Sequence, residues 1–180
     1  MPFREAWLAL GILLFLIGFG AGQPSIAGVG LVIIVLGWVA RFWSKHLFDR
    51  VTLKREMPEN RVFIGERLPL SVELSNAKAL PLPWFEWRLS LSEELPVEGE
   101  QLASSAVPGM KWLYRRGALG WYHKQAWKFT ILPDRRGYHQ VGPGSIKSAD
   151  LLGALPRTIE DDRRDSIVVF PEVFTLDELG

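Results

Sequence analysis

Residues whose types and spacing could do chemistry are few in this sequence. The three histidines, His46, His123 and His139, lie far apart, and no metalloprotease, serine-hydrolase or phosphate-loop motif is present. A Ser-His-Asp catalytic site formed by residues distant in the sequence is the alternative, although no spacing indicates one. The adjacent carboxylates Glu93-Glu94 and Asp161-Asp162 are typical of solvated loops, since neighbours on a strand point to opposite faces. We therefore predict that the protein is not an enzyme and has no cofactor and no metal site.

Cysteine is absent from the 180 residues. This excludes thiolate nucleophiles, disulfides, iron–sulfur clusters and cysteine-based zinc sites. The 21 Lys and Arg nearly balance the 20 Asp and Glu, for a net charge of +1. A nucleic-acid partner usually requires a concentrated basic face, so we predict no nucleic-acid binding.

The segment Arg135-Arg136-Gly137-Tyr138 is the sharpest local feature. Arginine binds carboxylates and phosphates well, so Arg135, Arg136 and Tyr138 are candidate partner-contact residues. The alternative interpretation is a hairpin turn with exposed arginines and a glycine that starts a strand. A second aromatic group could form an exposed surface, although we expect about half of it to be core: Trp112, Tyr114, Trp121 and Tyr122.

An apolar segment precedes the part of the chain that carries these residues. Residues 6–40 contain no Asp, Glu, Lys, Arg or His. As one helix they would extend about 52 Å, well beyond a hydrocarbon core of about 30 Å. The run Gly20–Ser25 contains Pro24, which breaks a helix, and Ser25, which can cap the next one. Within residues 1–50 we therefore predict a transmembrane hairpin of two helices, at about 6–21 and 26–42.

The charges beside the helices predict their orientation. Arg4 precedes the first helix, Arg41, Lys45 and Arg50 follow the second, and the loop between them is uncharged. Positive residues stay inside, so both ends should be cytoplasmic, in a multi-pass protein of the plasma (inner) membrane. A cleaved signal peptide is the alternative for the first helix.

Glycine spacing indicates how the two helices meet. Gly11 and Gly18, and Gly30 and Gly37, are each seven residues apart and share a helix face. Small residues let membrane helices approach closely, so we expect these faces to pack against each other. Dimerisation through Gly18 and Gly22 is the alternative, and the oligomeric state is not predicted.

From residue 51 onward the hydrophobic pattern has period two. Leu70, Val72 and Leu74 alternate with polar residues, and so do two sets that begin at Phe85 and at Trp127. Each set predicts a strand with one buried face, and further strands are expected at 51–56, 112–115, 137–141 and 167–170. We expect turns at Pro81–Trp84, Gly117–Gly120 and Gly142–Gly144, a long loop at Glu93–Gly109, and a solvated turn at Glu160–Asp165. Residues 51–180 are therefore predicted to form an immunoglobulin-like antiparallel β-sandwich, with Trp87 and Trp127 in its core.

The order of several short segments resembles the N-terminal part of domain-of-unknown-function family 58. These are bacterial and archaeal membrane proteins often encoded beside MoxR-type AAA+ ATPases. After the hairpin, the matching segments are Phe63–Glu66, Val72–Asn76, Leu80–Trp84, Arg135–Tyr138, Val141–Pro143, Ser148–Gly153 and Val168–Pro171. The resemblance implies structural roles for Gly65, Glu66, Asn76, Gly137, Gly142, Pro143, Asp150 and Gly153.

Two departures from that family limit what the resemblance implies. Members continue past the position of Pro171 into a region similar to a von Willebrand A domain, which this sequence, ending at Gly180, lacks. The sequence is thus expected to be a truncated member, a fragment, or an N-terminal half that serves alone. Leu151 stands where a proline is usual, so the role of that turn is in doubt.

These observations favour a non-enzymatic, membrane-anchored interaction module. The resemblance implies a scaffold for complex assembly or maturation that works with an AAA+ ATPase. The alternative is an envelope-facing domain that binds glycan or peptide, which needs the opposite topology. A third interpretation is an accessory to a membrane transglutaminase-like or protease enzyme.

Overall fold

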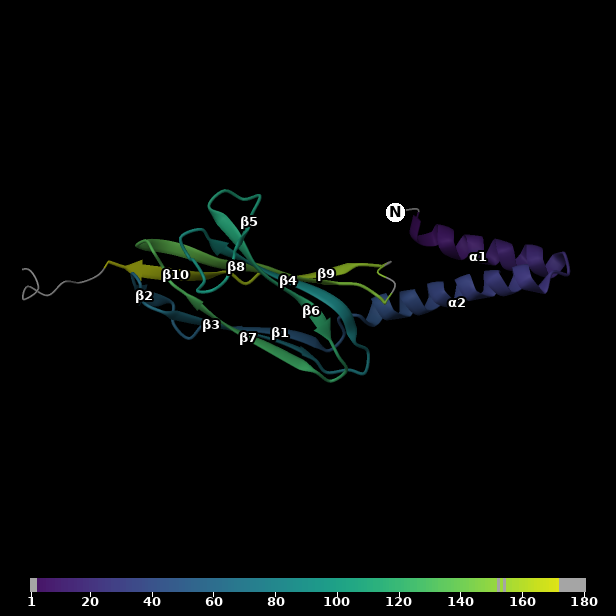
Figure 1. Ribbon diagram of the computed structural model, residues 1–180, viewed down its shortest axis with the longest axis horizontal. Helices are drawn as coiled ribbons and strands as arrows, with labels where there is room; N and C mark the ends of the chain where they lie inside the picture. Colours follow the sequence, from purple (N-terminus) through teal and green to yellow (C-terminus); the bar gives the residue numbers. More distant parts are fainter. Residues whose placement is uncertain (1–2, 152, 154, 172–180) are drawn as a thin grey trace, which may run out of the picture. The chain divides into compact units, whose positions relative to one another are not determined.

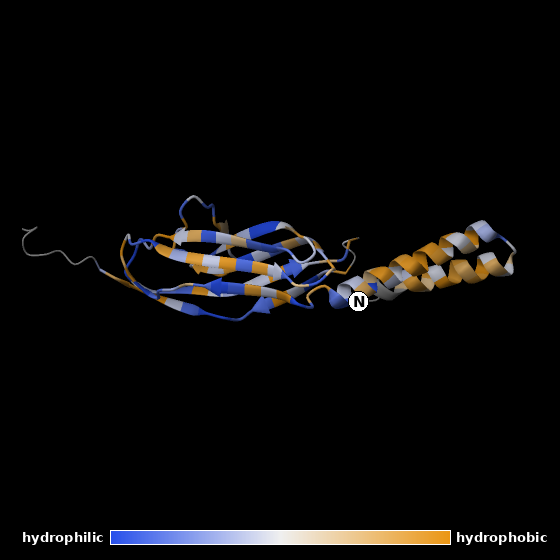
Figure 2. Cartoon of the chain, turned by 90° about the horizontal axis from the view of Figure 1, so that it is seen from below, coloured by the Kyte–Doolittle hydropathy of each residue, from blue (hydrophilic) through white to orange (hydrophobic). Residues whose placement is uncertain are grey.

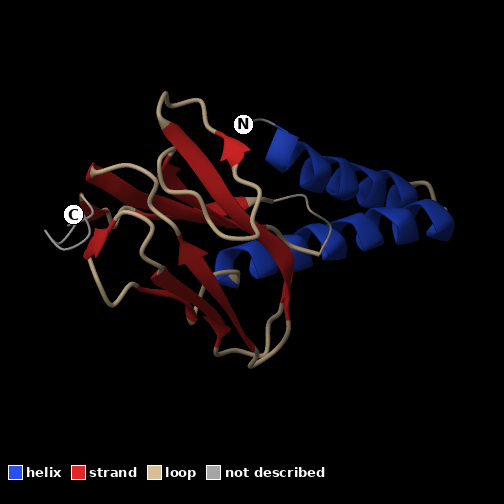
Figure 3. Cartoon of the chain, turned by 60° about the vertical axis from the view of Figure 1, so that its left-hand side comes forward, coloured by secondary structure: helices blue, strands red, loops and turns tan. Residues whose placement is uncertain are grey.

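The computed structural model describes residues 3–151, 153 and 155–171 and contains two compact units. The first consists of the helices up to Phe48 together with Ala149–Pro156. The second is a two-sheet sandwich that contains Asp49–Ser148 and the described residues from Arg157 onward. Figure 3 shows the helices in blue and the strands in red. The prediction of a mainly β sandwich that follows two helices is confirmed.

The helices are α1 (Phe3–Gly20) and α2 (Pro24–His46). Gln23, not Ser25, occupies the N-cap of α2, and Pro24 takes the first helical position, where its missing N–H has no helical acceptor to lose. The predicted Ser25 cap is therefore wrong. Of the described helices, α2 alone is long and apolar enough to cross a membrane, and the apolar part of α1, Ala6–Gly20, is shorter.

Glycines bring the two helices into contact, as the seven-residue spacing predicted. A Cβ atom at Gly18 would lie 2.2 Å from the backbone nitrogen of Ala27, and one at Gly30 would lie 2.4 Å from the backbone nitrogen of Phe15. Closer to the other end of the hairpin, a Cβ at Gly37 would lie 2.9 Å from Leu8. These contacts pair α1 and α2 in antiparallel register. Many of the other apolar side chains of the two helices are exposed. Figure 2 colours most of both helices orange, which marks hydrophobic residues.

The smaller sheet of the sandwich has the strand order β1-β3-β7, with β1 at Val51–Glu56, β3 at Leu68–Asn76 and β7 at Lys124–Ile131. The larger sheet has the order β2-β10-β8-β4-β6-β5, and β9 also pairs with β8 (Figure 1). Its strands are β2 (Arg61–Phe63), β4 (Leu82–Ser92), β5 (Ala103–Ser104), β6 (Met110–Leu119), β8 (Gly137–Ser148), β9 (Arg157–Asp161) and β10 (Asp165–Phe170).

The core lies between the two sheets. Leu70, Val72 and Leu74 of β3 are buried, as their alternation predicted. Trp87 is buried, whereas Trp127 is half-buried and stacks on it with ring centroids 6.3 Å apart. The alternation in β7 thus identified the inward face correctly, although one of the two tryptophans is incompletely covered.

Several predicted turns are parts of strands. Gly142–Gly144 lies inside β8, Gly117–Leu119 belongs to β6, and the Pro81–Trp84 segment enters β4 through an irregular register. Glycine and proline mark turns only where the chain reverses, and here neighbouring strands supply enough pairing to keep it extended. The expected loop Glu93–Gly109 contains β5 and places Leu95 and Val97 in the core.

The prediction of an entirely antiparallel sandwich is wrong at one pair, because β2 and β10 are parallel. These strands are far apart in sequence, so no hairpin turn sets their direction. The predicted solvated turn Glu160–Asp165 is also shorter than expected. Glu160 and Asp161 end β9, only residues 162–164 connect the strands, and Asp165 starts β10. Both strands run along the same edge of β8.

Candidate functional site

Arg135, Arg136 and Tyr138, the predicted partner-contact residues, lie at one end of the sandwich, where β7 turns into β8. Both arginines are exposed, and neither forms an ion pair with any residue that the structure describes. Tyr138 is 83% exposed. Nε2 of buried His139 donates a hydrogen bond of 2.8 Å to the carbonyl oxygen of Arg135, so the turn is held from the core side. We call this end, formed by residues 64–66, 132–138 and 170, the far end.

Two phenylalanines join Tyr138 at the far end. Tyr138 pairs with Val168 of β10, and Val168 pairs with Arg61 of β2. Phe63 and Phe170 lie two positions farther along their strands, on the same outer face, with ring centroids 6.0 Å apart. Phe63 is 48% exposed and Phe170 is 41% exposed. The far-end patch is defined as Arg61, Phe63, Tyr138, Val168 and Phe170, flanked by Arg135 and Arg136.

The patch could not be assembled from the sequence. Phe63 and Phe170 are separated by more than a hundred residues, and only the parallel β2–β10 pairing brings their rings together. Period-two alternation shows which residues of a strand share a face but not which strands are neighbours. The only sign of these two residues in the sequence is that each is an aromatic residue at the end of a short strand, Phe63 in β2 and Phe170 in β10.

Gly65 and Glu66, which the family resemblance marks as structural, support the far end. Gly65 has φ of +75° in the turn after β2, a conformation that glycine adopts without strain. Its N–H donates to the carbonyl oxygen of Pro133 at 3.0 Å, which ties this turn to the β7–β8 turn. Oε2 of Glu66 accepts a hydrogen bond of 2.8 Å from the Phe63 N–H. The β2 turn thereby holds Phe63 in place beside the arginine turn.

Asn76 lies at the opposite end of the sandwich, at the end of β3. Its buried Nδ2 donates to the carbonyl oxygens of Leu80 and Gly120, at 3.0 and 2.8 Å. Asn76 therefore joins two turns and is not part of the far-end patch.

Asp150 and Gly153 belong to the first unit. Asp150 is buried, its Oδ1 accepts the Leu155 N–H at 2.6 Å, and the Gly153 N–H donates to its carbonyl oxygen at 2.9 Å. Their contacts form a closed turn, next to which Leu151 is exposed. This arrangement is structural.

Gly142 and Pro143 lie in the middle of β8, opposite the break between β9 and β10, and are joined by a cis peptide bond. A Cβ atom on Gly142 would lie 2.2 Å from the carbonyl oxygen of Arg163. That same oxygen accepts a hydrogen bond of 2.8 Å from Nη2 of Arg55, a buried side chain from β1 of the other sheet. Nη2 of Arg55 also bonds Asp165 at 3.0 Å, and Asp161 lies 3.7 Å from Nη1. These contacts connect β1 of the smaller sheet to β9 and β10 of the larger sheet.

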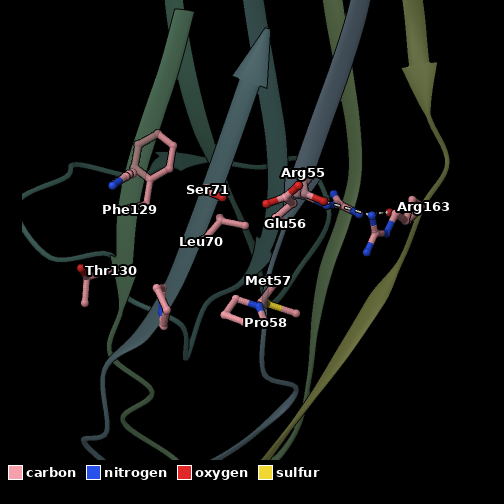
Figure 4. Close-up of a pocket in the computed structure, with 11 residues that line it drawn as sticks. Arg55, Glu56, Met57, Pro58, Leu70, Ser71, Phe129, Thr130 and Arg163 are labelled. Atoms are coloured by element: carbon pink, nitrogen blue, oxygen red, sulfur yellow. Dashed lines mark hydrogen bonds between the residues drawn. The ribbon is translucent and has the colours of Figure 1, made fainter.

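A pocket of about 740 Å³ opens beside this cluster (Figure 4). It is lined by strands β1, β3 and β7, the segment after β1, and Arg163: Arg55, Glu56, Met57, Pro58, Pro69, Leu70, Ser71, Lys128, Phe129, Thr130 and Arg163. Its one aromatic ring, Phe129, is 4% exposed, so the lining offers no broad aromatic face on which a sugar ring could stack. Charged groups of both signs and short apolar side chains suit a peptide better. Among the described residues, no group of three or more His, Asp or Glu is placed to hold a metal ion.

No protein-family model matches this sequence, and no curated protein matches it. Some solved structures are similar in part. The CARDB domain of the PF1109 protein from Pyrococcus furiosus is 12% identical, with a TM-score of 0.44 over 68% of this chain and 94% of that chain. PapD-like domain 7 of human CEP192 is 17% identical, with a TM-score of 0.38 over 67% of this chain and 87% of that chain. A β-glucosidase from Listeria innocua is 12% identical, with a TM-score of 0.38 over 68% of this chain and 16% of that chain. At these scores the similarities assign neither a fold nor an activity to this chain.

Proposed function

We propose that this protein is a membrane-anchored interaction module of immunoglobulin-like type, whose sandwich binds a protein partner through the far-end patch. The observation that carries the proposal is the exposed group of Phe63, Tyr138 and Phe170 beside Arg135 and Arg136. Tyrosine and arginine are enriched at the hot spots of protein interfaces, and exposed apolar groups gathered on one face favour being covered. Arg135 and Arg136, which form no ion pair with the described part of the chain, can bind carboxylates of the partner.

The membrane anchor is supported by the outward-facing side chains of the hairpin. Phe19 and Trp38 are 76% and 70% exposed, and they belong to a surface with few polar groups. The 23 residues of α2 extend about 34 Å, enough to cross a hydrocarbon core of about 30 Å. The shorter α1 is held along α2 by the glycine contacts, and a bilayer thins locally around a short span. We propose that both helices cross, in a multi-pass arrangement in the plasma (inner) membrane.

The orientation follows from the positive residues. Arg41, Lys45 and Arg50 follow the apolar part of α2, and Arg4 precedes that of α1, whereas the connecting residues 21–23 are uncharged. Both chain ends then lie in the cytoplasm together with the sandwich. The resemblance to family 58 implies that the partner is an AAA+ ATPase of the MoxR type. It also implies that the two proteins act in the assembly or maturation of a larger complex.

Photo-crosslinking in native membranes tests the partner surface. A photoreactive amino acid replaces Tyr138 in the full chain, and Val107, which is 58% exposed and lies outside the patch, is the matched control position. We expect a defined protein adduct from position 138, its loss in the Arg135→Glu/Arg136→Glu background, and no such adduct from position 107. Mass spectrometry of the adduct then identifies the ATPase or another protein. Equal labelling from both positions would contradict the proposed surface.

The pocket beside Arg163 favours a second candidate, an envelope-facing domain that binds a peptide. This function requires the sandwich to lie outside the cytoplasm. Reporter fusions after Gly180, one active only in the periplasm and one only in the cytoplasm, distinguish the two candidates. A cytoplasmic signal supports the ATPase-linked module, and a periplasmic signal reverses the order of the two.

A further inference from the structure

The turn between β6 and β7 carries two aromatic side chains that no core element covers. Trp121 is 69% exposed and Tyr122 is 70% exposed, whereas the strands on either side of the turn contribute Leu119 and Phe129 to the core. Tyr122 has φ of +50°, in the left-handed region that a bulky side chain rarely adopts. Asn or Gly would occupy this position with less strain, so the folding of the turn itself does not explain an aromatic residue here.

This turn lies at the end of the sandwich where the chain arrives from α2. The Tyr122 N–H donates to the carbonyl oxygen of Lys78 at 3.1 Å, and Nζ of Lys78 donates to the carbonyl oxygen of Asp49 at 2.9 Å. A parallel connection runs from the Ala77 N–H to the carbonyl oxygen of Arg50 at 3.0 Å. We call this end, formed by residues 49–51, 76–80 and 120–123, the near end.

Chain connectivity places the near end close to the bilayer surface if α2 spans the membrane. Asp49 follows His46, the last residue of α2, by three residues, which can extend at most about 11 Å. The headgroup region on each side of the hydrocarbon core is about 5–8 Å thick. The far end is separated from the near end by the 12 residues of β8, about 36 Å of extended chain.

We propose that Trp121 and Tyr122 lie in the headgroup region of the phospholipid bilayer and form a second contact between the sandwich and the membrane. This inference rests on the proposed membrane anchor. Tryptophan and tyrosine are the residues that prefer this region, because an apolar ring and a polar N–H or O–H both find a suitable environment there. Arg50, Lys78 and Lys124 add positive charge to this end of the sandwich, where Nζ of Lys78 donates to the carbonyl oxygen of Asp49 and Nζ of Lys124 lies 3.4 Å from a carboxylate oxygen of Glu73.

Burial lowers the pKa of Lys78 to about 8, and the carboxylate of Asp49 opposes this shift only in part. A lipid phosphate near the ammonium group would favour its charged form.

The absence of cysteine allows a direct test with the full chain reconstituted in liposomes. Single variants Trp121→Cys and, as a control at the other end of the strands, Val107→Cys are labelled with an environment-sensitive fluorophore. We expect the label at position 121 to show blue-shifted emission and to be quenched by lipids brominated near the headgroup. The label at position 107 should show neither effect. In detergent-free vesicles, Tyr122→Asn should weaken the quenching at position 121.

Carbonate extraction of the same vesicles separates this inference from the proposal on which it rests. If the chain resists extraction and the label at position 121 is no more quenched than that at position 107, the headgroup contact is overturned and the anchor stands. If carbonate releases the chain, the anchor is overturned, and the headgroup contact with it. Resistance to extraction together with selective quenching at position 121 supports both.

Discussion

The carbonyl oxygen of Arg163 approaches Gly142 so closely that no side chain fits on that residue. A Cβ atom there would lie 2.2 Å from this oxygen, and φ at Gly142 is +105°. The same oxygen is an acceptor for Arg55, so the backbone cannot withdraw without breaking the contact between the sheets. The need for glycine at this position comes from a close approach within the sheet and not from a turn.

Gly142→Ala should therefore destabilise the sandwich by about 3 kcal/mol, because strain in the backbone and displacement of Arg163 act together. Chemical denaturation of the purified chain in detergent, followed by tryptophan fluorescence, measures the change. Gly120→Ala is the control, since its nearest contact would be 3.8 Å away and its φ is not in the left-handed region. Equal stability of the two variants would show that the strand relaxes around the new methyl group.

Glu86 is a second residue whose surroundings decide its behaviour. Burial acts to raise the pKa of its carboxyl group, but hydrogen bonds and charges from Arg116 and Arg88 outweigh burial and hold that pKa below its ordinary value. Because the pKa is lower in the folded state, the unfolded chain binds more protons as the solution becomes acidic. Glu86 therefore stabilises the fold above its unfolded pKa, and this contribution is lost as the pH falls through the folded pKa.

Glu86→Gln should lower the free energy of unfolding at pH 7 and should make its dependence on acidic pH less steep. The difference from the unmodified protein should shrink as the pH falls through the folded pKa of Glu86, because the protonated carboxyl group is uncharged like the glutamine amide. Denaturation curves at several pH values test this, with the exposed Glu59→Gln as the control. A difference that stays constant from pH 7 to pH 3 would show that the effect of the substitution is not electrostatic.

At the scale of elements, the cluster around Arg55 joins strands of different sheets. Its side chain is 3% exposed and reaches from β1 to Asp165 and Asp161, which begin β10 and end β9. Removing one partner of a buried ion pair leaves the other charges without compensation. The edge of the smaller sheet thus depends on a polar contact as well as on apolar packing.

Arg55→Met should destabilise the sandwich by about 3 kcal/mol, because methionine fills similar space but removes the buried cation beside both aspartates, and of these Asp165 keeps its ion pair with Arg163. Arg67→Met removes an exposed ion pair with Glu98 and should cost no more than about 1 kcal/mol. The two variants are compared by the same denaturation experiment. A loss from Arg55→Met as small as that from Arg67→Met would mean that packing alone holds the sheets together.

The helical hairpin is held by close backbone contact. Gly18→Leu should separate the helices, since even a Cβ atom would lie 2.2 Å from the Ala27 nitrogen. Gly28→Leu is the matched control, because a Cβ at Gly28 meets nothing within 4 Å. Oxidation of a Leu8→Cys/Gly37→Cys pair, which requires packed helices, reports the result. We expect disulfide formation to slow in the first background and to stay unchanged in the second.

At the scale of the whole molecule, the apolar surface of α2 is expected to decide where the protein resides. Val35 is 51% exposed and lies near the middle of that helix. An aspartate in the middle of a spanning helix costs about 3 kcal/mol, so Val35→Asp should markedly lower the carbonate-resistant fraction of the chain. Thr52→Asp, an exposed change in the sandwich, should not. Full resistance of the Val35→Asp chain would argue against insertion of α2.

The amino-acid sequence alone determined the features that depend on local periodicity. It identified the two apolar helices, the break before Pro24, the glycine faces, and the buried faces of β3, β4 and β7. Such features follow from the fixed spacing of side chains along a helix or a strand. It also located the exposed turn that carries Arg135, Arg136 and Tyr138.

Only the tertiary structure decided which distant strands meet. The parallel pairing of β2 with β10 adds Phe63 and Phe170 to Tyr138, and the break opposite Gly142 brings Arg55 to Asp161 and Asp165. Pairing between strands remote in sequence depends on the sum of many weak contacts across the whole sandwich, and no local spacing encodes that sum. The far-end patch that we propose as the partner surface arises at the first of these non-local contacts.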